Sequence, residues 1–470
     1  MKRRDFLQKA GLASGGLALA CSGLTNRATL LGSSENLEKF RAIGYGDLFP
    51  TPTKNTGETF ISLPKGFEYN AFGKKGKKMS DDLVTPPAHD GMATFDFGNE
   101  IRLVRNHEVT NSHIPIEGSA IGAKPYDETA GGGTTTLVVN AETRELVRDF
   151  VSLSGTLMNC SGGRTPWGSW ISCEEETLGK TVITLKNGSK IGGFNKPHGY
   201  CFEVPSAENS TVEAIPLKAM GRFVHEAIAV DKKSGIVYLT EDNRGGVGFY
   251  RFLPNRKTKF AEGGKLQILK VKGVDNFDAR TPMIDQTSFS AEWVTIDNPD
   301  PEEADTQPRA VLEEGLKKGA ATFTRLEGCD IDETGRVYFT STDGGNLKSG
   351  QIWAYEPTNL EEGNLRLLFE SPSFALLDMP DNVCFQPNSK LLYICEDGNY
   401  PGLGRPIDNF VKILTPSGQI AEFAKIITPD FSNDEFAGST FSKDGKTLFV
   451  NIQNVGVTLA IWGDWGNFEI

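Results

Sequence analysis

Carboxylates stand at both ends of short apolar hairpin-like segments in this sequence. In residues 223–243 (FVHEAIAVDKKSGIVYLTEDN), Glu226 precedes one apolar run, and Glu241 and Asp242 follow the second. The polar turn DKKSG between the runs predicts a β-hairpin, which places the two ends side by side. Because hard cations prefer clustered oxygen ligands, such a hairpin end is suited to metal binding.

The same pattern recurs along the chain. Residues 327–343, 381–397 and 435–453 repeat it closely, and residues 89–108 and 159–175 fit it more loosely. Each copy has a polar or acidic start, a short apolar run, a tight turn with Gly, Asn or Asp, and a second apolar run. A repeated supersecondary unit of this kind is typical of a propeller.

The repeats predict an all-β fold in a single domain, a β-propeller with six blades over residues 61–470. A pair of sandwich domains is the structural alternative. Residues 254–322 are expected to form loops over one face, with one short helical pattern at 310–318. Residues 21–60 are interpreted as a leader or linker.

Equivalent hairpin ends of a propeller meet on one face around its axis, so these side chains are expected to converge. Because like charges raise each other's pKa, such a group needs cations, and oxygen donors favour calcium, magnesium, manganese or ferric iron. A solvated turn is the alternative for any one pair, but recurrence favours a metal cluster. The converging residues are Glu108, Cys160, Glu174, Glu175, Glu226, Glu241, Asp242, Glu327, Asp381, Glu396, Asp397 and Glu435.

Cys160 and Arg325 add chemistry that carboxylates lack. Cys160 lies in the glycine-rich NCSGG, and a thiolate there is a soft ligand that points to iron; a disulfide is its alternative. Arg325 precedes Glu327 by two positions, so both point to one face of a strand. Its planar guanidinium suits a phosphate or carboxylate ligand, or balances the carboxylates. Cys384 and Cys395 are expected to face each other across a hairpin, as buried thiols or as a disulfide.

The N-terminal segment predicts export. Arg3 and Arg4 precede an apolar stretch that ends at Ala18-Leu19-Ala20, so residues 1–20 resemble a cleaved twin-arginine signal read by the twin-arginine export machinery. The mature chain is then periplasmic or secreted, and Cys21 offers a lipid anchor as the alternative. No other apolar run is long enough to span a bilayer.

Charge and motif content exclude several function classes. The formal net charge is −12, which argues against a nucleic-acid partner. The chain has only five histidines, and it has no G-x-S-x-G, P-loop, H-E-x-x-H or CxxC motif, so a serine hydrolase or a histidine-based zinc site is not expected. We expect a monomer that acts on small molecules.

Five segments together resemble the PhoX-type alkaline phosphatase family, over residues from about 85 to 453. They are NHE at 106–108, NCSGGRTPWGSWISCEE at 159–175, RLEG at 325–328, MPDN at 379–382 and EFAG at 435–438. The resemblance implies a β-propeller that hydrolyses phosphate monoesters with a cluster of Fe3+ and Ca2+. It implies that Cys160 binds iron, that carboxylates share iron and calcium, and that two residues contact the phosphate. The carboxylates include Glu174, Glu175, Glu226, Glu327 and Asp381, and the phosphate contacts are Arg325 and Asn159.

Two other classes of function remain open from the sequence. A propeller with calcium alone fits a lactonase or a phosphotriesterase, in which Cys160 has no role. A non-catalytic exported binding protein, stiffened by calcium, is the second alternative.

Overall fold

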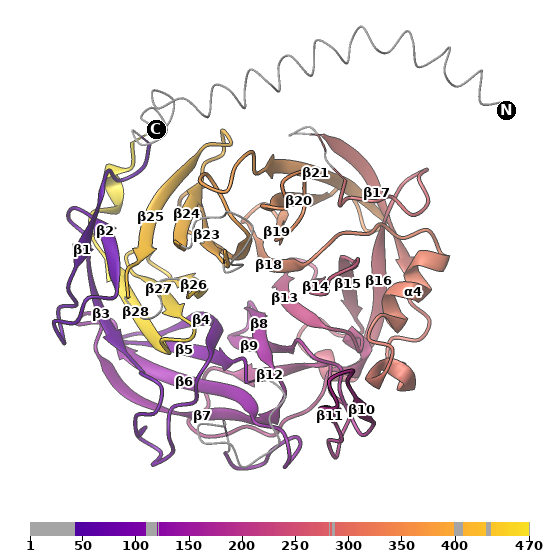
Figure 1. Ribbon diagram of the computed structural model, residues 1–470, viewed down its shortest axis with the longest axis horizontal. Helices are drawn as coiled ribbons and strands as arrows, with labels where there is room; N and C mark the ends of the chain where they lie inside the picture. The colour runs from indigo at the N-terminus through magenta and orange to yellow at the C-terminus, as the bar shows by residue number, and fades with distance from the viewer. Residues whose placement is uncertain are drawn as a thin grey trace, which may run out of the picture.

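The strands of the chain surround a central axis in a computed structural model (Figure 1) that describes residues 43–109, 120, 122–281, 283, 287–398, 408–428 and 434–469. Each of the six repeated segments forms an antiparallel hairpin. The first strands contact one another in a closed ring, β4, β8, β13, β18, β22, β26 and again β4. The predicted all-β propeller is therefore confirmed. The hairpins are β4 (His89–Phe97) with β5 (Glu100–His107), β8 (Asn159–Arg164) with β9 (Ser169–Glu174), β13 (His225–Val230) with β14 (Val237–Glu241), β18 (Leu326–Ile331) with β19 (Val337–Ser341), β22 (Pro380–Phe385) with β23 (Leu392–Glu396), and β26 (Phe436–Phe441) with β27 (Leu448–Ile452).

Outer strands extend each hairpin away from the axis. Strand β17 pairs with both β16 and β21, so two neighbouring hairpins share one nine-stranded sheet. The short hairpin β10 (Val182–Thr184) and β11 (Lys190–Gly192) follows β9. The outer strands are β6 (Gly132–Asn140), β7 (Leu146–Thr156), β12 (Cys201–Pro205), β15 (Tyr250–Pro254), β16 (Gly264–Val271), β17 (Ser288–Thr295), β20 (Gln351–Pro357), β21 (Glu362–Glu370), β24 (Phe410–Leu414), β25 (Ile420–Ile426) and β28 (Val457–Trp462).

The segment 254–322 is more ordered than its sequence suggests. The expectation of loops was wrong for β16 and β17, where Leu266, Ile268 and Ala291 are buried and pack as strand residues. The helical pattern at 310–318 is confirmed as α4 (Ala310–Lys317), which packs Val311 and Leu312 inward at the outer edge of the sheets (Figure 1). The 3-10 turns are η1 (Lys218–Met220), η2 (Phe260–Glu262), η3 (Glu302–Asp305) and η5 (Trp465–Asn467).

The two ends of the described chain close the propeller. Strand β3 (Glu68–Phe72) pairs with β28, so an N-terminal strand completes the last sheet. Strands β1 (Leu48–Thr51) and β2 (Ile61–Pro64) extend β25, so part of the segment interpreted as a leader is built into a sheet. The predicted signal, with Arg3 and Arg4, and the possible lipid anchor Cys21 lie outside the described residues. Among the described residues, every helix is too short or too polar to cross a bilayer.

Apolar side chains fill the space between neighbouring sheets. Phe249, next to β15, stacks on Phe339 of β19 with ring centroids 4.2 Å apart. Burial of such faces is the main favourable contribution to the stability of the fold. Cys173, Cys329, Cys384 and Cys395 share these interfaces as free, buried thiols, and Cys384 pairs across its hairpin with Tyr393 rather than with Cys395. The expected facing of Cys384 and Cys395 was therefore wrong.

Glycines let the innermost strands approach one another closely. A Cβ atom on Gly163 of β8 would lie 2.1 Å from the backbone oxygen of Ile228, and one on Gly328 of β18 would lie 2.3 Å from that of Asp381. Both clashes are with backbone, which cannot move aside as a flexible side chain can. The ring around the axis therefore depends on residues without a side chain at these positions.

Replacing Gly163 by Ala should force β8 and β13 apart. We expect G163A to lower the free energy of unfolding by about 1–3 kcal/mol, the usual cost of overpacking. Gly466 has only one atom, 3.4 Å away, near the Cβ position, so G466A is the matched control. The denaturant midpoint measures both variants, and equal midpoints for them would contradict this account of the ring.

Candidate metal centre

Five of the six hairpins turn one acid or thiol toward the axis from the first strand. These residues are Asp90, Cys160, Glu226, Glu327 and Asp381. Each is the first residue of a β-bulge, because the pairing of every inner hairpin shifts at this place. A bulge re-aims a side chain that regular alternation would send elsewhere. In the sixth hairpin, Ala437 occupies the same position, next to a similar shift.

A second set of side chains comes from the residue that directly follows the second strand of each hairpin. Each member makes the same kind of backbone hydrogen bond. Its N–H donates to the carbonyl of the residue that lies two positions before the axis-facing residue of the first strand. Thus Glu108 donates to Ala88, and Glu175 donates to Met158. Six hairpins therefore supply two rings of side chains at one end of the axis. The second ring is Glu108, Glu175, Asp242, Thr342, Asp397 and Gln453.

Backbone strain is concentrated two residues before the axis-facing residues of the first strands. Ala88, Met158, Arg325 and Met379 occupy the same position in four hairpins, and their φ angles are 50°, 51°, 39° and 52°. Non-glycine residues rarely adopt positive φ, because the Cβ atom crowds the backbone. Such strain is typical of functional sites and persists only where surrounding contacts hold it.

The axis-facing residues of the first strands, from Asp90 to Asp381, form the first ring. Side chains from neighbouring hairpins hydrogen-bond to the backbone carbonyls of this ring. Asn106 Nδ2 donates to the carbonyl oxygen of Cys160 (3.1 Å), and Thr240 Oγ1 donates to that of Glu327 (2.7 Å). The same contact runs from Thr340 to Asp381 (3.1 Å) and from Asn451 to Asp90 (2.6 Å). Each donor lies two residues before a member of the second ring, so neighbouring hairpins fix each other's ring residues.

Cys160 lies among the carboxylates. Its Sγ atom is 3.5 Å from Asp90 Oδ2 and 3.3 Å from Glu226 Oε1. Two overlapping groups each place their ligand atoms within 4.8 Å of one another, Asp90 with Glu108 and Cys160, and Cys160 with Glu175 and Glu226. The thiol is therefore shared by two potential metal positions.

Arg325 is the cation of the cluster. Its guanidinium forms ion pairs with Glu327, with Asp242 (Nε to Oδ2, 3.3 Å) and with Asp397 (Nη2 to Oδ2, 3.4 Å). Arg325 is 8% exposed and Glu327 is 4% exposed, so these charges meet away from bulk water. Three carboxylates thus fix the direction of one planar donor group.

Burial and mutual repulsion raise the pKa values of the acidic groups. Burial, followed by the neighbouring Asp397 and Asp381, raises the pKa of Glu108 to about 7. Burial first, and then other carboxylates, raises the pKa of Asp90, Glu226 and Glu435 well above the usual range. The charged forms therefore need compensation that this part of the chain does not supply by itself.

Three of the predicted ligands do not reach the cluster. Glu174, Glu241 and Glu396 are each the last residue of a second strand, one position before the second ring, so alternation turns them away from the axis. They accept hydrogen bonds from backbone N–H groups and neighbouring side chains instead. Glu174 accepts from the N–H groups of Leu157, Gly199 and Tyr200 and from His198; Glu241 accepts from Gly248 and Tyr250; Glu396 accepts from Asp378 and Phe410.

Asn159 also points away from the cluster. It is fully buried, its Oδ1 accepts from Thr156 Oγ1 (2.6 Å), and its Nδ2 donates to Ser172 Oγ (2.8 Å). The Asn159 amide therefore stabilises the start of β8, next to Cys160. The structure does bring Glu108, Cys160, Glu175, Glu226, Arg325, Glu327, Asp381 and Glu435 together, with Asp242 and Asp397.

The sequence interpretation missed Asp90 and Gln453. Gln453 Nε2 donates to Asp90 Oδ2 (3.0 Å) and to Glu108 Oε2 (2.7 Å), so it joins the two rings. A signal for Asp90 was present, because His89-Asp90 opens its repeat as His225-Glu226 opens another. Gln453 had no such signal, since its equivalents are mostly acids.

The donor set fits metal cations. Carboxylates and one thiolate are the ligands of hard and borderline cations. Oδ1 of Asp90 is buried and has no hydrogen-bond partner among the described residues, which is costly unless a ligand completes it. The residues present thus match the metals that a site of this type would hold.

Comparison with known proteins places these features in context. The family described as alkaline phosphatase PhoX matches residues 44–456. The solved structure of Pseudomonas fluorescens PhoX in complex with vanadate, a transition state analogue, is 19% identical, with a TM-score of 0.68 over 91% of this chain and 99% of that chain. A gluconolactonase from Xanthomonas campestris is 12% identical, with a TM-score of 0.40 over 89% of this chain and 97% of that one. Comparison with curated protein sequences gave no match.

The off-axis pair of His198 and Glu174 should make stability depend on pH. Burial alone lowers the pKa of His198, but the Glu174 carboxylate and the bonds to Asp127 and Glu174 outweigh it and raise the pKa to about 9. Because the folded pKa lies above the unfolded value of 6.5, protonation stabilises the fold fully below pH 6.5. This contribution, about 3 kcal/mol, is lost as pH rises through 9.

His198→Gln tests this expectation. The wild-type advantage in free energy of unfolding should be largest near pH 6 and should shrink by pH 9.5, as measured by denaturant titration of both proteins. An advantage that stays constant over this range would show that His198 is not protonated in the folded state.

Proposed function

Because the chain belongs to the PhoX alkaline phosphatase family, we propose that it hydrolyses phosphate monoesters at the axial cluster with Fe3+ and Ca2+ as its metals. The family makes it a metal-dependent phosphoric ester hydrolase. The observation that carries the assignment of the site is the convergence of a thiol, many carboxylates and Arg325 at one buried place.

Different parts of the two rings suit the two metals. Cys160 with Glu175 and Glu226 suits iron, because a thiolate is a softer ligand than oxygen. The all-oxygen remainder suits calcium, which takes six to eight oxygen ligands. Bound cations of this kind polarise phosphoryl oxygens and lower the pKa of a bound water. The residues we assign to calcium are the ring members Asp90, Glu108, Asp242, Glu327, Asp381 and Asp397, together with the neighbouring Glu435.

Arg325 is the residue we assign to substrate binding. Its planar fork of N–H donors matches two oxygens of a phosphoryl group. Asp242, Glu327 and Asp397 orient the guanidinium before substrate arrives, which reduces the entropy lost on binding. Asn159, which the resemblance assigns to phosphate, is better suited to fixing the backbone beside Cys160.

The position of Cys160 separates this function from its alternatives. A lactonase or phosphotriesterase with calcium alone would leave the thiol without a role, whereas Sγ lies 3.3 Å from Glu226 and 3.5 Å from Asp90. A non-catalytic binding protein would not need Arg325 held by three carboxylates. Both observations support the phosphatase.

The cellular setting follows from the N-terminal sequence. We propose that the twin-arginine machinery exports the folded chain to the periplasm or beyond, with cleavage after residue 20 or a lipid anchor at Cys21. The substrates are then small extracellular or periplasmic phosphate esters, and the working form is a monomer.

Arg325→Ala and Cys160→Ala should each lower kcat/KM for 4-nitrophenyl phosphate by at least about 100-fold, since each removes a group from the transition-state environment. Cys329→Ala, a thiol in β18 outside the rings, and Arg256→Ala, an exposed arginine paired with Glu262, are the matched controls. Full activity in both test variants would refute the site.

Glu175→Gln should reduce activity, whereas Glu174→Gln should reduce stability. Glu175 faces the cluster, so E175Q should lose activity with little loss of stability. Glu174 binds backbone N–H groups and His198, so E174Q should lower the free energy of unfolding by about 1–3 kcal/mol, while the folded fraction keeps activity. Activity and denaturation curves are measured on the same samples. If E174Q alone lost activity, the assignment of Glu175 to the cluster and of Glu174 to the surrounding backbone would be reversed.

A further inference from the structure

A second space lies on the axis, on the other side of the rings. It is a cavity of about 640 Å3. Its lining includes the residues that directly follow Asp90, Cys160, Glu327, Asp381 and Ala437 in the sequence, namely Gly91, Ser161, Gly328, Asn382 and Gly438. The first-ring residues themselves do not line it. One layer of backbone therefore separates this cavity from the carboxylate cluster.

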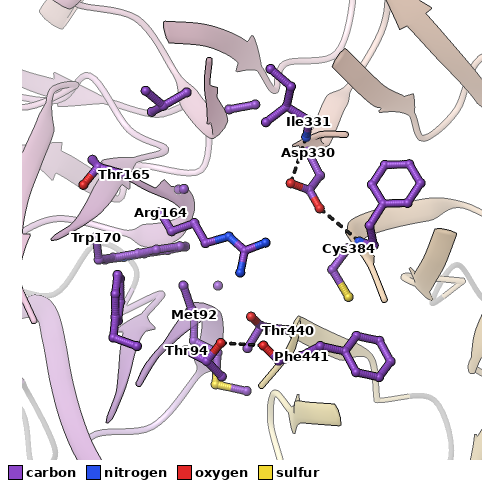
Figure 2. A pocket seen from close by; sticks show the side chains of 18 of the residues that line it. Met92, Thr94, Arg164, Thr165, Trp170, Asp330, Ile331, Cys384, Thr440 and Phe441 are labelled. Carbon is purple, nitrogen blue, oxygen red and sulfur yellow. Dashed lines mark hydrogen bonds between the residues drawn. The ribbon is translucent and has the colours of Figure 1, made fainter. Parts of the chain in front are cut away.

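Arg164 is the feature of the cavity that calls for a ligand. It is the last residue of β8, and Figure 2 shows its guanidinium reaching into the middle of the space, between Trp170 and Asp330. No described residue forms a hydrogen bond or an ion pair with it. A planar group of five N–H donors is thus presented to the cavity with only solvent to accept.

Arg164 and the facing carboxylate of Asp330 attract each other electrostatically, but no hydrogen bond or ion pair joins them. Asp330 is held by the backbone, because one oxygen accepts from the N–H of Ile331 (2.8 Å) and the other from that of Phe385 (3.0 Å) (Figure 2). Lys232, Lys443, Asp96 and Glu333 also line the cavity and are exposed. The lining carries three basic and three acidic side chains, so it has no net formal charge, and the unused chemistry is the hydrogen-bond donation of Arg164.

Apolar side chains form one part of the walls around the guanidinium, and hydroxyl side chains such as Thr94, Thr165 and Thr440 form another part. Trp170 and Met92 lie on one side and Phe441 on another, as Figure 2 shows, and Phe95 and Val383 belong to the same lining. Such walls favour a ligand with a flat or apolar body, while the arginine orients its charged head.

We propose that this cavity binds a small organic anion, with its carboxylate, phosphate or sulfonate head paired to Arg164 and its apolar body against Trp170 and Phe441. The site is separate from the carboxylate cluster and does not use its metals. It is therefore a second ligand site, independent of phosphate ester hydrolysis.

The test uses 4-nitrobenzoate, which carries an anionic head and an aromatic body, and which quenches tryptophan fluorescence on contact. Titration of the full chain should give saturable quenching, because Trp170 lines the cavity. Arg164→Gln should raise the dissociation constant at least about tenfold, as expected for loss of a charged hydrogen-bond partner. The exposed, ion-paired Arg256 provides the control variant R256Q, which should bind as the wild type does.

Two further titrations separate this site from the cluster and from simple hydrophobic binding. Arg325→Ala should keep the wild-type dissociation constant, and neutral 4-nitrobenzamide should bind weakly and equally to wild type and R164Q. Loss of binding in R325A with retention in R164Q would overturn the proposal, as would equal quenching by acid and amide. Because Arg164 is exposed, R164Q should fold as the wild type does, and its denaturant midpoint verifies this.

Discussion

Repulsion among buried carboxylates is the constraint on which this structure depends. Among the residues that the structure describes, nine carboxylates, from Asp90 to Glu435, share the end of one axis with a thiol and one arginine. Arg325 pairs with three of them, which leaves most of the charge uncompensated within the described chain. Burial raises the pKa of these acids, and each ionised neighbour raises it further. Multivalent cations relieve both costs at once, and the same cations are what phosphate ester hydrolysis requires.

The fold meets this constraint by repeating one local device around a ring. Each inner hairpin carries a shift in register that turns a side chain of its first strand toward the axis, next to the residue that leaves its second strand. Hydrogen bonds such as that from Thr240 to the carbonyl of Glu327 tie each hairpin to the next. Glycines such as Gly163 and Gly328 bring the inner strands close enough for these bonds to form. Positive φ angles at Met158 and Arg325 show that the backbone is held away from its preferred conformation at this place.

The sequence predicted the fold and most of the cluster, and its errors have a common physical origin. Repeated hairpins and their acidic ends were enough to predict a propeller and the convergence of Cys160, Glu226, Glu327 and Asp381. Adjacent acids such as Glu174-Glu175 could not be separated, because which of the two faces the axis depends on where the strand ends. Asn159 was also misassigned, because its side chain bonds Thr156 and Ser172 instead of facing the axis. Bulges also have no simple sequence pattern, so Asp90 was passed over although His89-Asp90 resembles His225-Glu226. Strands β16 and β17 were taken for loops because the segment 254–322 is a long insertion between two copies of the repeat.

Elemental analysis of the chain, purified after export by a host with a twin-arginine system, tests the central claim most directly. Two rings of carboxylates around Cys160 predict that iron and calcium are both retained, in amounts that are stoichiometric with the protein. Calcium without iron would contradict the assignment of Cys160. A folded, active chain that retains neither metal would contradict the account as a whole, because the buried carboxylates would then have to be neutralised in some other way.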